Sequence, residues 1–106
     1  MSIPEFSDEE LEALIEDAVI DAYGDDEQFM GMMVMVQENL ELPFTTRVLG
    51  VKVSVVDVEE RGLNIVAICE RGEHRQVLPL TDLPIPDPPP EGVEWIAAWR
   101  LYASRY

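Results

Sequence analysis

The chain has little positive charge, and all of it lies in one part of the sequence. Its 106 residues include seven Lys and Arg against 22 Asp and Glu, and no basic side chain precedes Arg47. Phosphate, nucleic-acid and anionic-membrane binding depend on clustered basic side chains, so these functions are disfavoured. Thirteen acids fall within residues 1–46. Their repulsion would be relieved by salt, by a basic partner or by a multivalent cation, unless they only keep the domain soluble.

Cysteine and histidine are almost absent, with one of each. Cys69 has no second cysteine to pair with, and its apolar, strand-like surroundings predict a buried, inert thiol. One Cys and one His are too few ligands for a soft-metal site. His74 lies in a predicted turn, and no nucleophile motif or glycine-rich phosphate loop is found. We therefore expect no enzyme, although a hydrolase built on paired carboxylates stays open as an alternative.

The sequence also has no apolar run as long as a membrane span. Residues 1–5 are acidic rather than like a signal peptide, so a cytoplasmic protein is expected. A chain of this length with 47% hydrophobic residues predicts a single domain over residues 1–106. Within it we expect an acidic helical part (1–42), a β part (43–83), and a proline-rich connector with a closing helix (84–106).

Two helices are predicted in the acidic part. Ser7 and Glu10 form a capping box, and the apolar spacing that follows predicts a helix ending near Tyr23–Gly24. A second helix, capped by Asp25 or Asp26, runs to about Asn39 and is apolar almost all round, which is typical of a buried helix. It contains four methionines within six residues. We interpret them as core residues, with an adaptable peptide-binding groove as the alternative.

The second half of the chain changes to the periodicity of strands. Turn residues separate four segments rich in Val, Ile and Leu, and a β-bulge near Val55–Val56 would curl their sheet. A final helix over Glu91–Ser104 presents one aromatic stripe, interpreted as a lid on the core. The expected fold is α+β: two N-terminal helices, a small curled antiparallel four-stranded sheet (an SH3-like partial barrel) and one C-terminal helix. The predicted strands are Thr45–Leu49, Val51–Val58, Leu63–Cys69 and Arg75–Leu80.

The abundant carboxylates suit a hard cation, because Ca²⁺ takes six to eight oxygens in irregular geometry. An EF-hand is excluded: a twelve-residue loop read from Asp21 places Asp26 where Gly is required and Met32 at the closing Glu. A site must then be assembled from separate segments. The end of the second helix offers two carboxylates and unpaired carbonyls, and acids after the second and fourth strands could converge on it. The predicted ligands are Glu38, Glu41, Asp57, Glu59, Glu60 and Asp82.

Four segments are similar to a known family. Residues 37–44 (Gln-Glu-Asn-Leu-Glu-Leu-Pro-Phe), followed by residues 50–55, resemble the opening of the small acidic, non-EF-hand calcium-binding protein family first described in heterocyst-forming cyanobacteria. Residues 78–83 and the tryptophan-rich residues 95–102 resemble later elements of it. The resemblance implies an α+β domain that binds Ca²⁺ through surface carboxylates, with a buffering or signalling role and no catalysis. By their position in these motifs, Glu38 and Asp82 match the family best. The other four ligands are predicted only from the abundance and placement of carboxylates: Glu41, Asp57, Glu59 and Glu60.

The sequence departs from the family pattern at two positions. Thr45 and Ala98 stand where an acid often occurs in the family. If either acid is a ligand elsewhere in the family, this chain binds Ca²⁺ more weakly or has lost the site. An alternative function needs no metal. In it, the first helix would dock a basic protein partner or mimic a nucleic acid through the face formed by Glu9, Glu12, Glu16 and Asp17.

Overall fold

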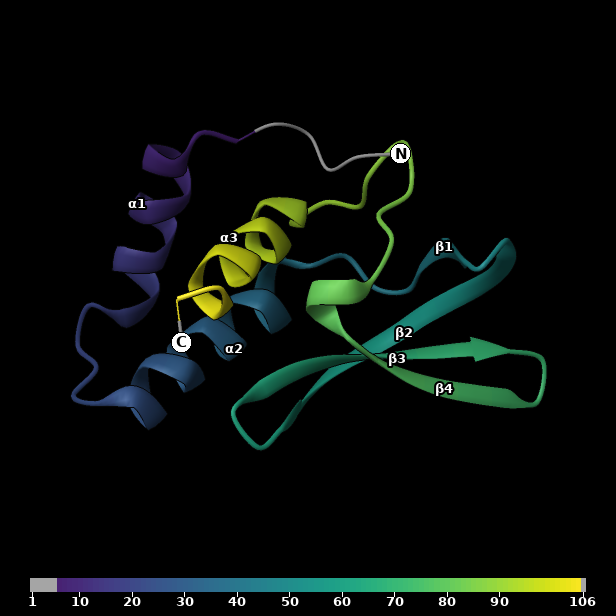
Figure 1. Cartoon of the computed structure of the whole chain (residues 1–106), viewed down its shortest axis with the longest axis horizontal. Helices are drawn as coiled ribbons and strands as arrows, with labels where there is room; N and C mark the ends of the chain where they lie inside the picture. The colour runs from purple at the N-terminus through teal and green to yellow at the C-terminus, as the bar shows by residue number, and fades with distance from the viewer. Residues whose placement is uncertain (1–5, 106) are drawn as a thin grey trace.

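The computed structural model describes residues 6–105, so the acidic start at residues 1–5 lies outside the described part. The elements in chain order are α1 (Asp8–Val19), α2 (Asp25–Asn39), β1 (Phe44–Val48), β2 (Val51–Arg61), β3 (Asn64–Arg71), β4 (His74–Pro79), the 3₁₀ turn η1 (Leu80–Asp82) and α3 (Val93–Ala103). Three helices gather at one end of the long axis, the β1–β2 and β3–β4 hairpins extend to the other end, and the β2–β3 hairpin turns back toward the helices (Figure 1). The predicted α+β class is confirmed, with two helices before the sheet and one after it.

Helix α1 begins as predicted and ends earlier than predicted. Both bonds of the capping box form: the Glu10 N–H donates to Ser7 Oγ at 3.1 Å, and the Ser7 N–H donates to Glu10 Oε1 at 3.2 Å. The Ala22 N–H bonds to the Val19 carbonyl at 2.9 Å, a tighter turn that leaves the α-helical path. The last turn of α1 contains no basic residue to favour its negative end. The predicted extension to Tyr23–Gly24 is therefore wrong by about one turn.

Helix α2 packs against α1 and α3. Its N-cap is Gly24 at φ +103°, so Asp25 and Asp26 lie in the first turn and the predicted aspartate cap is wrong. Met32 and Met33 are buried, which confirms core packing for these two methionines. Gly31 allows α1 to approach closely, because a Cβ added there would lie 2.2 Å from the Ala18 carbonyl oxygen.

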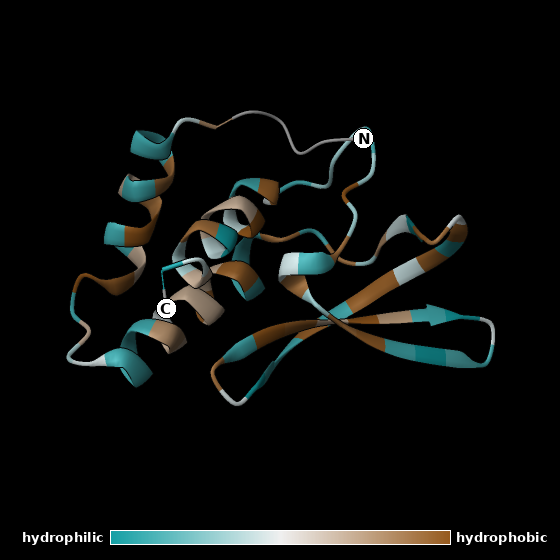
Figure 2. Ribbon diagram, in the orientation of Figure 1, coloured by the Kyte–Doolittle hydropathy of each residue, from teal (hydrophilic) through white to brown (hydrophobic). Residues whose placement is uncertain are grey.

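The sheet is open and antiparallel, in the order β1-β2-β3-β4. The predicted bulge is confirmed: Val55 pairs with Cys69 and Asp57 pairs with Ile68, so Val56 falls outside the register. Because of this shift, Val55 and Val58 are both buried. Hydrophobic residues follow the central strands toward the helices (Figure 2). Strand β2 continues to Arg61, three residues beyond its predicted end.

Helix α3 covers the core as predicted. The ring of Trp99 lies edge-on to Phe29, with ring centroids 5.7 Å apart, and stacks on Tyr102 at the same distance. Trp95, Ala98, Trp99 and Tyr102 are all buried. Within residues 6–105, every helix is too short or too polar to cross a membrane.

Cys69 is a free, buried cysteine, as predicted, and burial raises the pKa of its thiol. A raised pKa keeps the sulfur protonated at neutral pH, and only the thiolate is a good nucleophile. We expect Ellman's reagent at pH 7.5 to leave the folded protein unmodified and to modify one thiol in 8 M urea. Rapid modification of the folded protein would show that the sheet opens at β3.

Candidate metal centre

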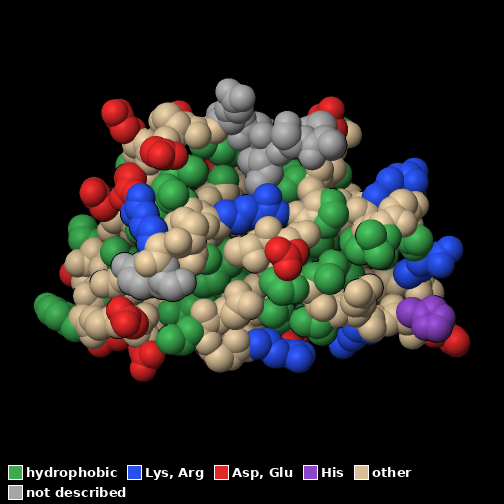
Figure 3. Space-filling model, in the orientation of Figure 1, with side chains coloured by type: hydrophobic (Ala, Val, Ile, Leu, Met, Phe, Trp, Pro, Cys, Tyr) green, Lys and Arg blue, Asp and Glu red, His purple; other side chains and the backbone are tan. Residues whose placement is uncertain are grey.

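Charge is unevenly distributed over the molecule. Figure 3 shows many of the visible Asp and Glu over the helical end, and His with several Lys and Arg toward the end of the hairpins, although other basic side chains lie among the helices. On α1, Glu9, Glu16 and Asp17 are exposed, whereas Glu12 is ion-paired with Arg105 near the end of the chain. One member of the acidic face predicted to dock a basic partner is therefore already paired within the protein.

The end of α2 and the start of α3 are joined through their backbones. The Glu41 N–H donates to the Glu91 carbonyl at 2.9 Å, and the Glu91 N–H donates to Glu41 Oε1 at 3.1 Å. Beside them, a Cβ added to Gly92 would lie 2.1 Å from the Asn39 carbonyl oxygen. This reciprocal contact fixes the Glu41 carboxylate against a rigid part of the fold.

The last turn of α2 also offers main-chain oxygens. The Leu40 N–H closes the final helical bond, to the Val36 carbonyl at 3.0 Å. The next donor, the Glu41 N–H, bonds to Glu91 instead, so the Gln37 carbonyl loses its helical donor. Gln37 and Glu38 are both exposed. Two carboxylates, from Glu38 and Glu41, therefore flank a helix end with a main-chain oxygen available.

The three predicted ligands on β2 lie elsewhere. Asp57, Glu59 and Glu60 are inside the strand rather than after it. The Asp57 Oδ1 accepts the Val58 N–H at 2.9 Å, and Glu59 lies 3.7 Å from the Arg61 guanidinium.

Strand β2 leads away from the end of α2. Leu63, in the turn that follows it, and Asn64, the first residue of β3, line a hollow together with Asp25 and Phe29 from the start of α2. Glu38 is at the other end of that 15-residue helix, which at about 1.5 Å per residue is roughly 20 Å long. The strand acids therefore approach the wrong end of α2 for the predicted convergence.

Asp82 lies in η1 beside a fixed cation. The Arg100 Nη2 donates to the carbonyls of Leu80 and Leu83, at 3.3 and 2.5 Å. Burial lowers the pKa of Arg100, and the nearby Asp82 carboxylate acts in the opposite direction. Because the Arg100 cation already lies near the Asp82 carboxylate, this carboxylate attracts a second cation more weakly.

The six predicted ligands do not form one cluster. Across residues 6–105, no group of three or more Asp, Glu, His or Cys side chains lies close enough to hold one metal ion. What the structure does bring together is Glu41 and Glu91. Glu91 was missed in the sequence, and its only signal is an acid that follows the proline run directly before a helix.

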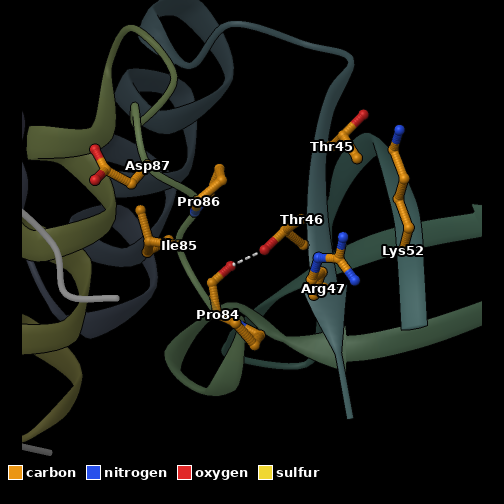
Figure 4. Close-up of a pocket in the computed structure, with 8 residues that line it drawn as sticks. All are labelled: Thr45, Thr46, Arg47, Lys52, Pro84, Ile85, Pro86 and Asp87. Carbon is orange, nitrogen blue, oxygen red and sulfur yellow. Dashed lines mark hydrogen bonds between the residues drawn. The ribbon is translucent and has the colours of Figure 1, made fainter. Parts of the chain in front are cut away.

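A hollow of about 520 Å³ lies between β1 and residues 84–87 (Figure 4). The Thr46 hydroxyl donates to the Pro84 carbonyl across it at 2.6 Å. Two of its lining residues, Arg47 and Lys52, are cations, and Asp87 is its one carboxylate. A cation site is therefore not expected in this hollow.

Comparisons with known proteins agree with these observations. A family model for CcbP, described as "Calcium binding", matches residues 12–103. A solved structure described as a "calcium binding protein in the calcium-binding form" has 22% identity and a TM-score of 0.69, covering 92% of each chain. The crystal structure of CcbP from Anabaena has 24% identity and a TM-score of 0.68, covering 96% of this chain and 94% of that one. At these identities the two structures show a shared fold. No curated protein matches.

Proposed function

Because the chain belongs to the CcbP family of calcium-binding proteins, whose model matches residues 12–103, we propose that it binds Ca²⁺ at the end of α2. We further propose that it does so without catalysis, in the cytoplasm, as a buffer or a signalling protein. The observation that carries the location is the reciprocal contact between Glu41 and Glu91, which holds one oxygen of the Glu41 carboxylate in place.

The donors at this helix end suit Ca²⁺ chemically. Glu38 and Glu41 supply carboxylate oxygens, the Gln37 carbonyl supplies a main-chain oxygen, and water completes a shell of six to eight. Asp57, Glu59, Glu60 and Asp82 contribute long-range attraction in this proposal, which salt weakens. The acids of α1 act in the same way. Since only two carboxylates supply charge directly, we expect a dissociation constant on the order of 10⁻⁴ M.

Calcium titration by calorimetry tests the proposal. In 150 mM KCl a true site keeps a saturable heat with defined stoichiometry, because bound oxygens act at contact distance. An ion atmosphere around a net charge of −15 loses most of its heat at that ionic strength. Heat that vanishes between 10 and 150 mM KCl would argue against a specific site.

Ca²⁺ is also expected to stabilise the fold more than Mg²⁺. An ion that binds only the native state raises the melting temperature, by an amount set by its concentration relative to the dissociation constant. At 5 mM, a dissociation constant of about 10⁻⁴ M corresponds to roughly 2 kcal/mol. Mg²⁺ requires octahedral geometry and keeps its waters, so it should use this irregular site poorly. Equal shifts for the two ions at equal ionic strength, measured by calorimetric melting, would show screening alone.

A further inference from the structure

The β1–β2 and β3–β4 hairpins extend away from the helices (Figure 1). Their residues line an apolar hollow of about 450 Å³. Its apolar lining comes from the β1–β2 hairpin and from β3. Leu49, at the tip, is 98% exposed, and Val51 is 40% exposed. No described part of the chain covers this surface. The lining residues are Val48, Leu49, Val51, Val53, Cys69, Arg71, His74, Arg75 and Gln76.

Leu49, at the tip of the β1–β2 hairpin, is an unfavourable residue for the backbone geometry of the turn. Val48 pairs with Val51, so Leu49 and Gly50 form a two-residue turn. Both have positive φ, +51° and +79°, as a type I′ turn requires. Asn or Gly is preferred in such turns, whereas leucine is strained there. Leu49 therefore stabilises neither the turn nor the core. A strained residue with an exposed apolar side chain indicates a contact with another molecule.

Basic side chains line the hollow: Arg71, His74 and Arg75. Arg47 and Lys52, which pair in register beside the Val48–Val51 pair, point to the opposite face of the sheet and line the hollow beside residues 84–87. Four of the seven Lys and Arg residues of the chain are therefore on the hairpins at this end, and two of them line the hollow. Two acids accompany them. Glu70 pairs with Arg75 at 2.5 Å, and Glu73 lies in the adjoining turn.

We propose that this hollow docks an acidic segment of a partner protein, with an apolar side chain in the hollow and flanking carboxylates on the cations. The volume suits one large side chain with its neighbours. Charge complementarity selects an acidic occupant and gives specificity. The hollow lies on the hairpins, and none of its lining residues belongs to the α2–α3 junction, so the proposal does not rest on the proposed calcium site.

Two other occupants are less suited. A membrane surface recruits proteins through basic clusters of four to eight residues, whereas two arginines and one histidine line this hollow. A second copy could present Ile20 and Tyr23, which are 77% and 85% exposed near several acids. However, two copies each with a charge of −15 repel one another.

The test is selection from a random peptide library displayed on phage, with the full chain as bait. We expect enriched peptides in which Asp or Glu flanks a large apolar residue. A synthetic peptide of the enriched sequence should bind Leu49→Asn at least tenfold more weakly than the parent chain. Arg71→Glu combined with Arg75→Glu, two cations that line the hollow, should weaken binding similarly. Leu49→Asn is a clean probe because asparagine tolerates positive φ, so its melting temperature should stay equal or rise.

Leu63→Asn is the matched control, because Leu63 is 60% exposed at the opposite end of β2 and should leave peptide binding unchanged. Calcium titration of Leu49→Asn should match that of the parent chain, which separates this proposal from the calcium site. Enriched peptides that are basic, or that bind Leu49→Asn as tightly as the parent, would overturn it. So would co-sedimentation of the parent chain with phosphatidylserine vesicles, or a dimer in analytical ultracentrifugation that Leu49→Asn abolishes.

Discussion

Gly92→Ala is expected to lower the free energy of unfolding by about 3 kcal/mol or more. Two costs add at this position. Gly92 has φ +85°, a conformation that costs an alanine roughly 1–2 kcal/mol. The new Cβ would also lie 2.1 Å from the Asn39 carbonyl oxygen and 2.7 Å from the Leu40 Cα, both backbone atoms that cannot rotate away. In a domain of this size, the melting temperature should fall by at least about 10 °C.

Gly50→Ala separates these two costs. Gly50 has a similar φ of +79°, but an added Cβ would meet nothing within 4 Å. It should therefore show only the conformational cost of roughly 1–2 kcal/mol, as measured by urea unfolding monitored through tryptophan fluorescence. If Gly92→Ala unfolds at the same urea concentration as Gly50→Ala, the backbone contact between α2 and α3 does not contribute to stability.

The features predicted correctly from sequence depend on neighbours along the chain. The capping box of Ser7 and Glu10 needs residues three apart, so the sequence contains all of it. The bulge appears as a switch of the apolar face within one strand, from Val55 to Val58. Burial of the α3 aromatics follows from their helical spacing. In each case the residues involved lie close together in the sequence, so their spacing alone predicts the structure.

Which carboxylates lie close together is harder to predict, because it depends on distant parts of the chain. Strand β2 runs past its predicted end, so Glu59 and Glu60 approach the start of α2 rather than its end. Arg100 reaches η1 from α3, and its charge opposes Asp82. Glu91 meets Glu41 across fifty residues. Composition predicts that carboxylates are abundant, but only the packing of α2, α3 and the sheet decides which of them meet.

Replacing Glu38 and Glu41 together by glutamine is expected to weaken Ca²⁺ binding at least tenfold, or about 1.4 kcal/mol. Both charges are lost directly at the ion in the proposed site, where carboxylate oxygens lie about 2.5 Å from Ca²⁺. The fold should be little affected. A glutamine amide oxygen at position 41 can still accept the Glu91 N–H, which is the bond that Glu41 Oε1 makes now. The measurement is calorimetric titration in 150 mM KCl, with the melting temperature of each variant as a check on folding.

The matched control is Glu9→Gln with Glu16→Gln, two exposed acids of α1. Glu12 is unsuitable because it is paired with Arg105. Both double variants remove two negative charges, so long-range attraction falls equally and only the location differs. Because that attraction is screened over about 8 Å at 0.15 M salt, the α1 variant should bind within about twofold of the parent. Asp82→Asn should also bind nearly normally, since Arg100 already opposes that charge. Loss of binding in Asp82→Asn, with the Glu38 and Glu41 variant unaffected, would place the site at η1 instead of the end of α2.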